Sequence, residues 1–252
     1  MPARPIPVTE ANLIEIFSSI QGEGPYLGYR QLFIRFAHCN LSCTYCDTPF
    51  APVSACRVET APGSESFSSL KNPVSHKSIE TLLEDWVGGS PDLHHSLSLT
   101  GGEPLLQVPV LLDWLPMMRN YLPIYLETNG SLPAQLKSLL PWLDYISMDI
   151  KLPSISGHEL WDEHREFLGL ARQKTVFVKV VFAQTTPLSE IETAARLVAE
   201  TAPDVDLILQ PCTQSSGIKL TTGQMLKAQQ VAVTYHPKTR VIPQTHNFLG
   251  VL

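Results

Sequence analysis

Residues 31–48 read QLFIRFAHCNLSCTYCDT, and the predicted fold and chemistry both start from this stretch. Its first part, Gln31–Ala37, is an apolar run broken by a single arginine, which predicts a buried β-strand. Its second part carries three closely spaced cysteines, Cys39-x3-Cys43-x2-Cys46. Ligands of α/β proteins gather at the carboxyl ends of parallel strands, so a strand that runs into such a loop indicates a site there.

Strand-length apolar runs and helix-periodic stretches alternate along most of the chain. Further strands are expected at 96–99, 124–127, 145–150, 176–182, 205–210 and 240–242. Helices are expected at 78–87 with Ser78 as N-cap, 105–121, 134–140, 158–170, 188–200 and 222–233. This alternation predicts an α/β fold, a mostly parallel sheet with helices outside. About six or seven strands favour a partial (β/α)6-type barrel over a closed eight-stranded one. A doubly wound open sheet is the alternative.

The chain of 252 residues is interpreted as a single domain, residues 1–252. The stretch 51–76 interrupts the alternation, since it is rich in Ser, Pro and Glu and has little periodicity. We expect an inserted surface loop there.

Composition narrows the class of protein. The chain is 44% hydrophobic and 17% charged with a net charge of −6, which is typical of a folded globule. No block of Lys or Arg favours nucleic-acid binding. No run resembles a signal peptide or a membrane span, so a cytoplasmic protein is expected. Clustered cysteines in that compartment indicate metal or redox chemistry, not disulfides.

Three thiolates from one short loop suit an iron–sulfur cubane with one iron left open, because such clusters usually have four cysteine ligands. Tyr45, just before the third cysteine, and the preceding strand favour this interpretation. A structural zinc site would need a fourth ligand, for which His38 or Cys56 could serve. A redox-regulated thiol pair is also conceivable.

Polar segments follow the predicted strands at 39–48, 100–104, 127–130, 149–151 and 210–214, which indicates one shared active site. The cysteine spacing resembles the signature of the radical SAM superfamily. The resemblance implies a [4Fe–4S] cluster on Cys39, Cys43 and Cys46 that reductively cleaves S-adenosylmethionine (SAM). Thr100-Gly-Gly-Glu-Pro104 resembles the superfamily's GGE motif, although a tight strand-to-helix turn is an equal alternative. The SAM contacts implied are Tyr45, Cys46, Asp47, Gly102, Glu103, Ser147, Met148, Asp149, Gln210, Pro211, Cys212 and Thr213.

Motifs at the two ends of the chain give a closer resemblance. Ser19-Ile-Gln21-Gly-Glu23-Gly24 precedes the cysteines, and Pro243-Gln-Thr-His246 with Gly250 lies near the end. Together they resemble the 7-carboxy-7-deazaguanine synthase family, from about residue 13 to the end and least over 51–76. The resemblance implies a lyase of queuosine biosynthesis that converts 6-carboxy-5,6,7,8-tetrahydropterin to 7-carboxy-7-deazaguanine with loss of ammonia. It implies Mg²⁺ at Thr48, and a substrate site of Ile20, Gln21, Gly22, Glu23, Arg35, Thr100, His246 and Leu252. No further catalytic residue is expected beyond the cluster and SAM.

The chemistry of two of these side chains fits such a substrate. Glu23 is able to accept from the amino and ring N–H groups of a pterin. Arg35 suits the carboxylate as a bidentate partner, and a buried arginine is costly without an anion. An Arg–Asp pair inside the protein is the alternative.

Two other functions remain open from the sequence. A glycyl-radical-enzyme activase has the same cysteine spacing but needs no pterin site, so the QGEG segment argues against it. A non-enzymatic zinc- or cluster-binding module is the other. The family resemblance also implies an external electron donor such as flavodoxin or ferredoxin, and a homodimer.

Overall fold

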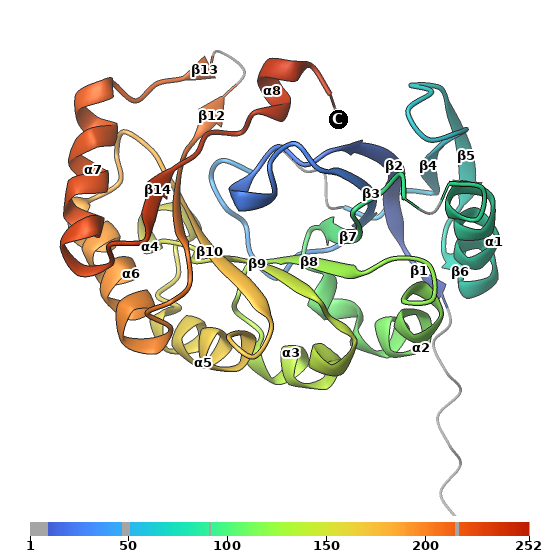
Figure 1. The fold of residues 1–252 in the computed structure, drawn as a ribbon, viewed down its shortest axis with the longest axis horizontal. Helices are drawn as coiled ribbons and strands as arrows, with labels where there is room; N and C mark the ends of the chain where they lie inside the picture. The colour runs from blue at the N-terminus through green and yellow to red at the C-terminus, as the bar shows by residue number, and fades with distance from the viewer. Residues whose placement is uncertain (1–9, 47–50, 91, 215–216, 252) are drawn as a thin grey trace, which may run out of the picture.

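The chain folds around one strongly curved β-sheet, with the larger helices on its outer face (Figure 1). The computed structural model describes residues 10–46, 51–90, 92–214 and 217–251. Within them, seven neighbouring strands of the sheet run parallel in the order β14-β11-β10-β9-β8-β7-β3. They are β3 (Arg30–Phe36), β7 (Ser96–Gly101), β8 (Ile124–Thr128), β9 (Tyr145–Asp149), β10 (Thr175–Phe182), β11 (Leu207–Pro211) and β14 (Thr239–Val241).

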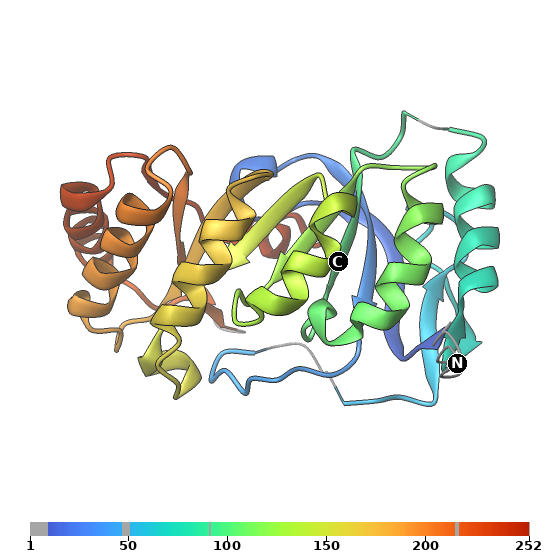
Figure 2. The same ribbon diagram turned by 90° about the horizontal axis from the view of Figure 1, so that it is seen from below.

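Helices follow these strands and cover the convex side of the sheet, as Figure 2 shows from below. The longer ones are α1 (His76–Val87), α2 (Val108–Met118), α3 (Pro133–Leu139), α5 (Trp161–Ala171), α6 (Leu188–Thr201) and α7 (Thr222–Tyr235). The short ones are α4 (Pro153–Ser156), α8 (His246–Leu249) and the 3₁₀ turns η1 (Gly24–Tyr26), η2 (Pro104–Gln107) and η3 (Leu140–Trp142). The main core lies between sheet and helices, where Phe36, Trp114 and Phe167 are fully buried. The predicted partial barrel is confirmed, and the described sheet stays open between its edge strands β14 and β5.

The sheet contains three strands that the sequence did not predict. β2 (Leu13–Ile20) is antiparallel to β3. The hairpin of β4 (Ala55–Glu59) and β5 (Phe67–Lys71) then extends the sheet beyond β2. The expectation of a surface loop over 51–76 is therefore wrong for these two segments. Cys56 and Val58 point into the core on alternate positions of β4, a short pattern that the surrounding Ser and Pro residues hid.

Smaller elements and boundaries complete the fold. Two short pairs join β1 (Glu10–Ala11) to β6 (Val74–Ser75), and β12 (Thr213–Gln214) to β13 (Gly217–Ile218). The predicted N-cap of α1 is wrong, because the Ser75 side chain accepts from the Ser78 backbone N–H at 3.2 Å. In the described part of the chain, no helix combines the length and the apolar character needed to cross a membrane.

Candidate active site

A cavity of about 630 Å³ lies on the concave side of the sheet, lined by strand residues such as Ser147 and Lys179 and by the loops at the carboxyl ends of the parallel strands. It brings together most of the predicted site residues. Those that line it are Ile20, Gln21, Gly22, Glu23, Arg35, Cys39, Cys43, Tyr45, Cys46, Thr100, Gly102, Ser147, Asp149, Gln210, Cys212, Thr213 and His246. Glu103, Met148 and Pro211 do not line it. Asp47, Thr48 and Leu252 lie outside the described residues.

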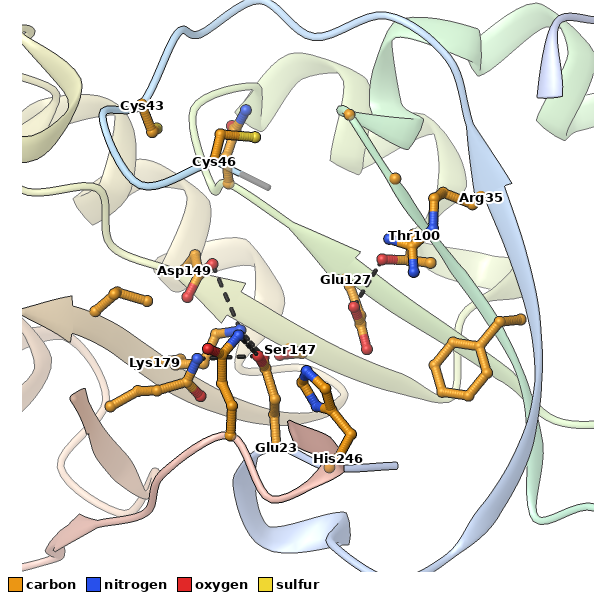
Figure 3. Close-up of a pocket in the computed structure, with 18 of the residues that line it drawn as sticks. Glu23, Arg35, Cys43, Cys46, Thr100, Glu127, Ser147, Asp149, Lys179 and His246 are labelled. Carbon is orange, nitrogen blue, oxygen red and sulfur yellow. Dashed lines mark hydrogen bonds and ion pairs between the residues drawn. The ribbon is translucent and has the colours of Figure 1, made fainter. Parts of the chain in front are cut away.

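The three cysteines of the loop after β3 face this cavity together, and Figure 3 shows two of them across it from Glu23. No disulfide joins the chain's five cysteines, all of which are described. No three His, Cys, Asp or Glu side chains among the described residues converge tightly enough to hold one metal ion. Three cysteines that face one cavity from a single loop suit the three-thiolate cluster that the sequence predicts. Cys56, a candidate fourth zinc ligand, is buried on β4 away from the cavity.

The TGGEP segment, Thr100–Pro104, contacts the start of the cysteine loop and holds it in place. A side chain at Gly102 would overlap the His38 carbonyl oxygen, so only glycine permits this close approach. The Glu103 backbone N–H donates to the same oxygen at 2.8 Å. The motif therefore supports the strand-to-loop junction as well as lining the cavity.

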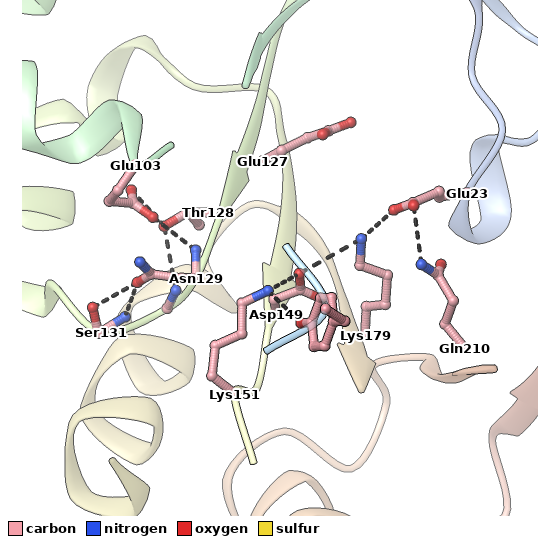
Figure 4. A network of polar contacts seen from close by, with 12 residues as sticks. Glu23, Glu103, Glu127, Thr128, Asn129, Ser131, Asp149, Lys151, Lys179 and Gln210 are labelled. Atoms are coloured by element: carbon pink, nitrogen blue, oxygen red, sulfur yellow. Dashed lines mark hydrogen bonds and ion pairs between the residues drawn. The ribbon is translucent and has the colours of Figure 1, made fainter. Parts of the chain in front are cut away.

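The Glu103 side chain is buried and does not line the cavity. Its fully buried carboxylate accepts from Leu105 N at 3.0 Å, Thr128 Oγ1 at 2.9 Å and Asn129 N at 2.8 Å (Figure 4). Burial raises the pKa of Glu103 to about 7, although these hydrogen bonds oppose the shift. Glu103 thus ties η2 to the end of β8. Met148 likewise packs into the core, because alternate residues of a strand face opposite sides.

Hydrogen bonds also anchor the cysteine loop to the turn after β8. Asn129 Nδ2 donates to Asn40 Oδ1 at 2.9 Å, and Asn40 Nδ2 donates to Ser131 Oγ at 2.9 Å. The Thr44 backbone N–H donates to the Ile155 carbonyl at 3.1 Å. The loop is thereby positioned by two neighbouring strand ends.

Polar atoms at the ends of β9 and β11 form the wall where a SAM molecule is expected. Lys151 Nζ donates to Asp149 Oδ2 at 2.7 Å and to the Tyr45 hydroxyl at 2.9 Å. Asp149 Oδ1, Gln210 Oε1 and Thr213 Oγ1 are buried and have no hydrogen-bond partner among the described residues. Buried polar atoms are normally satisfied, so these three indicate a polar ligand. Hydroxyl and amino donors of a nucleoside fit them.

Glu23 follows β2 and lies across the cavity from the cysteines. Its carboxylate accepts from Lys179 Nζ, from Gln210 Nε2 at 2.9 Å and from Gln244 Nε2 at 2.8 Å. Burial alone would raise the pKa of Glu23, but the Lys179 charge and the hydrogen bonds from Lys179 and Gln244 lower it to about 2. Glu23 is therefore an ionised acceptor at neutral pH.

A second carboxylate, Glu127 at the end of β8, faces the same end of the cavity (Figure 3). Its two oxygens accept from Gln21 Nε2 at 2.9 Å and from Thr100 Oγ1 at 2.7 Å. The sequence flagged its strand-end segment but gave Glu127 no role. Lys151 lies in the strand-end segment 149–151, which the sequence also flagged, but it too was given no role.

Arg35 lines the cavity but already has an internal partner. Its Nε donates to Glu15 Oε1 at 2.9 Å, and its guanidinium lies 5.7 Å from the centre of the Phe17 ring. The side chain is 23% exposed, so the cost of burying an unpaired charge no longer argues for a ligand. The pair uses Nε, which leaves the Nη groups for another acceptor.

The tail after β14 closes over the segment that carries Glu23. The Thr245 N–H donates to the Gly22 carbonyl at 2.9 Å, and His246 lies against Gly22. A side chain at residue 22 would overlap His246, so this position requires glycine for steric reasons. The predicted tail residue His246 and the unpredicted Gln244 thus reach the cavity together.

Comparisons with known proteins agree with this geometry. The family model described as the radical SAM superfamily matches residues 33–201. The 7-carboxy-7-deazaguanine synthase of Geobacter sulfurreducens is 47% identical over 247 residues, covering 96% of this chain and 98% of that protein. The Archaeoglobus fulgidus protein of the same name is 36% identical, covering 96% and 99%. The crystal structure of QueE from Escherichia coli matches with a TM-score of 0.55 and 18% identity over 94% of each chain, which supports the fold.

Proposed function

This chain belongs to the 7-carboxy-7-deazaguanine synthase family of the radical SAM superfamily, and on that basis we propose how its own residues serve the reaction. The enzyme is a lyase that converts 6-carboxy-5,6,7,8-tetrahydropterin to 7-carboxy-7-deazaguanine with loss of ammonia. The observation that carries the residue assignments is the single cavity, which has the three cysteines at one end and Glu23 at the other.

Cys39, Cys43 and Cys46 hold the [4Fe–4S] cluster, and the walls formed by β9 and β11 hold SAM. When bound, these two groups supply the one-electron chemistry that generates an adenosyl radical. Asp149 and Gln210 offer their unpartnered oxygens to SAM donors. Gly102, which follows β7, contributes backbone to the lining of the cavity beside the cysteine loop. Glu103 supports the cavity through the hydrogen bonds by which it joins η2 to the end of β8.

The opposite end of the cavity binds the pterin. Ionised Glu23 accepts from the ring N–H and the 2-amino group, and Gln21 lies beside it. The Nη groups of Arg35 pair with the substrate carboxylate, while Glu15 keeps the guanidinium in place. The work of these side chains is orientation, and the tail residues Gln244 and His246 help to exclude water.

Further parts of the proposal rest on the family resemblance. A magnesium ion is assigned to Thr48 beside the third cysteine, where a hydroxyl, water and substrate oxygens would complete its ligands. An external donor such as flavodoxin or ferredoxin would supply electrons. The protein is assigned to the cytoplasm as a homodimer.

Anaerobic reconstitution with iron and sulfide tests the function. The reconstituted chain should show cubane absorption that dithionite bleaches, and with SAM, reductant and the pterin it should form the deazapurine. Cys43→Ala should abolish both cluster and product. Glu23→Ala should keep the cluster and SAM cleavage but reduce product formation by at least about 100-fold, because two charge-assisted hydrogen bonds are lost. SAM cleavage by the wild type without a deazapurine product would refute the substrate assignment and leave the radical chemistry intact.

A further inference from the structure

Lys179 is a buried cation in the middle of the strand VFVKVVF, between the two ends of the cavity. Its side chain is 9% exposed and points into the concave side, among the acidic groups of the site (Figure 4). Its Nζ donates to Glu23 Oε2 and lies 3.6 Å from Asp149 Oδ2. Burial would lower the pKa of Lys179, but the Asp149, Glu23 and Glu127 carboxylates raise it. The ammonium therefore stays charged at this position.

The charge on Glu23 depends on this ammonium more than on any other group. The remaining donors to its carboxylate are the neutral amides of Gln210 and Gln244. Burial is the largest single influence on the pKa of Glu23, and it opposes ionisation. The charge of Lys179 is the largest of the influences that together outweigh it. Without the cation, burial would favour the protonated acid.

The two protonation states of Glu23 recognise different partners. An ionised carboxylate only accepts hydrogen bonds, so it fits two neighbouring N–H donors, as on the 2-amino-4-oxo edge of a pterin. A protonated carboxyl group has one O–H donor and one carbonyl acceptor. It would fit a 2-oxo ring, which presents a carbonyl next to a ring N–H.

We propose that Lys179 is a specificity-determining residue: by holding Glu23 as an acceptor-only carboxylate, it makes the substrate end of the cavity select 2-amino over 2-oxo heterocycles. The inference rests on the proposed function, because it takes Glu23 as the partner of the pterin's donor edge. Lys179 acts through Glu23 and needs no contact with the ligand.

Equilibrium binding of two unreactive, oxidised ligands tests the proposal: 6-carboxypterin, which has the 2-amino group, and 6-carboxylumazine, which has 2-oxo. Isothermal titration calorimetry with the reconstituted full chain and SAM gives both dissociation constants. The wild type should prefer the pterin by roughly 10- to 100-fold, the range expected when a charged group loses a hydrogen-bond partner. In Lys179→Met the preference should fall to about one or reverse.

Matched variants separate the effect of the Lys179 charge from the effect of its packing. Lys179→Arg keeps a cation and should keep the pterin preference. If Lys179→Met does not fold, Lys179→Gln removes the charge with less apolar surface and carries the same expectation. An unchanged preference in the folded neutral variant would overturn the proposal.

The variant Glu23→Gln distinguishes a failure of the role given to Lys179 from a failure of the proposed substrate placement. The glutamine amide has one donor group and one acceptor group whatever the charge of Lys179. This variant should therefore reverse the preference for pterin over lumazine by itself. If Glu23→Gln reverses the preference and Lys179→Met does not, the role of Lys179 is wrong and the substrate site stands. If Glu23→Gln also leaves the preference unchanged, Glu23 does not face the donor edge and the proposed substrate placement fails.

Discussion

Among single residues, the fully buried His164 gives the protein a specific dependence on pH. Its Nε2 lies 3.1 Å from the Asn129 carbonyl, and its Nδ1 has no partner among the described residues. Protonation would add a buried N–H without an acceptor. Burial lowers the pKa of His164 to about 4, although the Asn129 hydrogen bond opposes the shift. The neutral ring is therefore the form that the fold requires.

The sign of the effect follows from this lowered pKa. Between pH 6.5 and 4 the unfolded chain binds a proton at His164 that the folded chain does not bind, so acid favours unfolding. We expect the free energy of unfolding to fall by up to about 3 kcal/mol over this range because of His164. Urea unfolding at several pH values, compared with His164→Gln, measures the difference. Equal pH dependence in both proteins would contradict the prediction.

Residue identity alone could indicate what chemistry is present but not which way each side chain points. The three cysteines, Gln21 and Asp149 were predicted and do line the cavity. Glu103 belongs to a recognised motif, yet the turn after β7 directs its carboxylate to buried backbone donors. Lys179 was within reach of sequence reasoning, since the argument about a charge inside an apolar strand applied to it as well as to Arg35.

At the scale of elements, one side chain fastens the unpredicted hairpin to the sheet. Asn72, which follows β5, accepts from Leu13 N at 3.0 Å and donates to Leu13 O at 2.8 Å and Val53 O at 2.9 Å. Asn72→Ala should lower the free energy of unfolding by about 2–4 kcal/mol, because it leaves buried backbone groups unpaired. Denaturant titration measures the loss. Ser69→Ala, at an exposed position of β5, is the matched control and should change stability by less than about 0.5 kcal/mol.

The regular elements were predicted better than the irregular ones, for a physical reason. Most of the parallel strands are buried along nearly their whole length, so apolar runs such as Thr175–Phe182 stand out from their surroundings. β4 is only partly buried and β5 has no buried residue, and the pairing of β4 with β2 joins residues that are distant along the chain. Tertiary contacts, and not local pattern, determine these strands.

At the scale of the whole molecule, the tail is a separable part of the substrate site. A chain that ends at Pro243 loses the Gln244 hydrogen bond to Glu23 and the cover of His246 over Gly22. We expect its dissociation constant for 6-carboxypterin to rise by about tenfold or more, whereas iron content stays unchanged because β7 and β8 hold the cysteine loop. Iron analysis and calorimetry measure the two quantities. The control, Phe248→Ala, alters a side chain that is 74% exposed and should leave both unchanged. A fall in iron content together with affinity would contradict this separation.

The meeting of the two chain ends at Gly22 and His246 has a consequence for how such enzymes diversify. The superfamily model covers residues 33–201 and so includes the cysteines, whereas Glu23 and the tail lie outside it. The three cysteines and Glu23 are thus carried by different stretches of one chain. Because a side chain at residue 22 would overlap His246, neither end of the chain can change its sequence independently of the other. A descendant with a new substrate would have to acquire compatible changes at both termini, so the ends are expected to evolve as a pair.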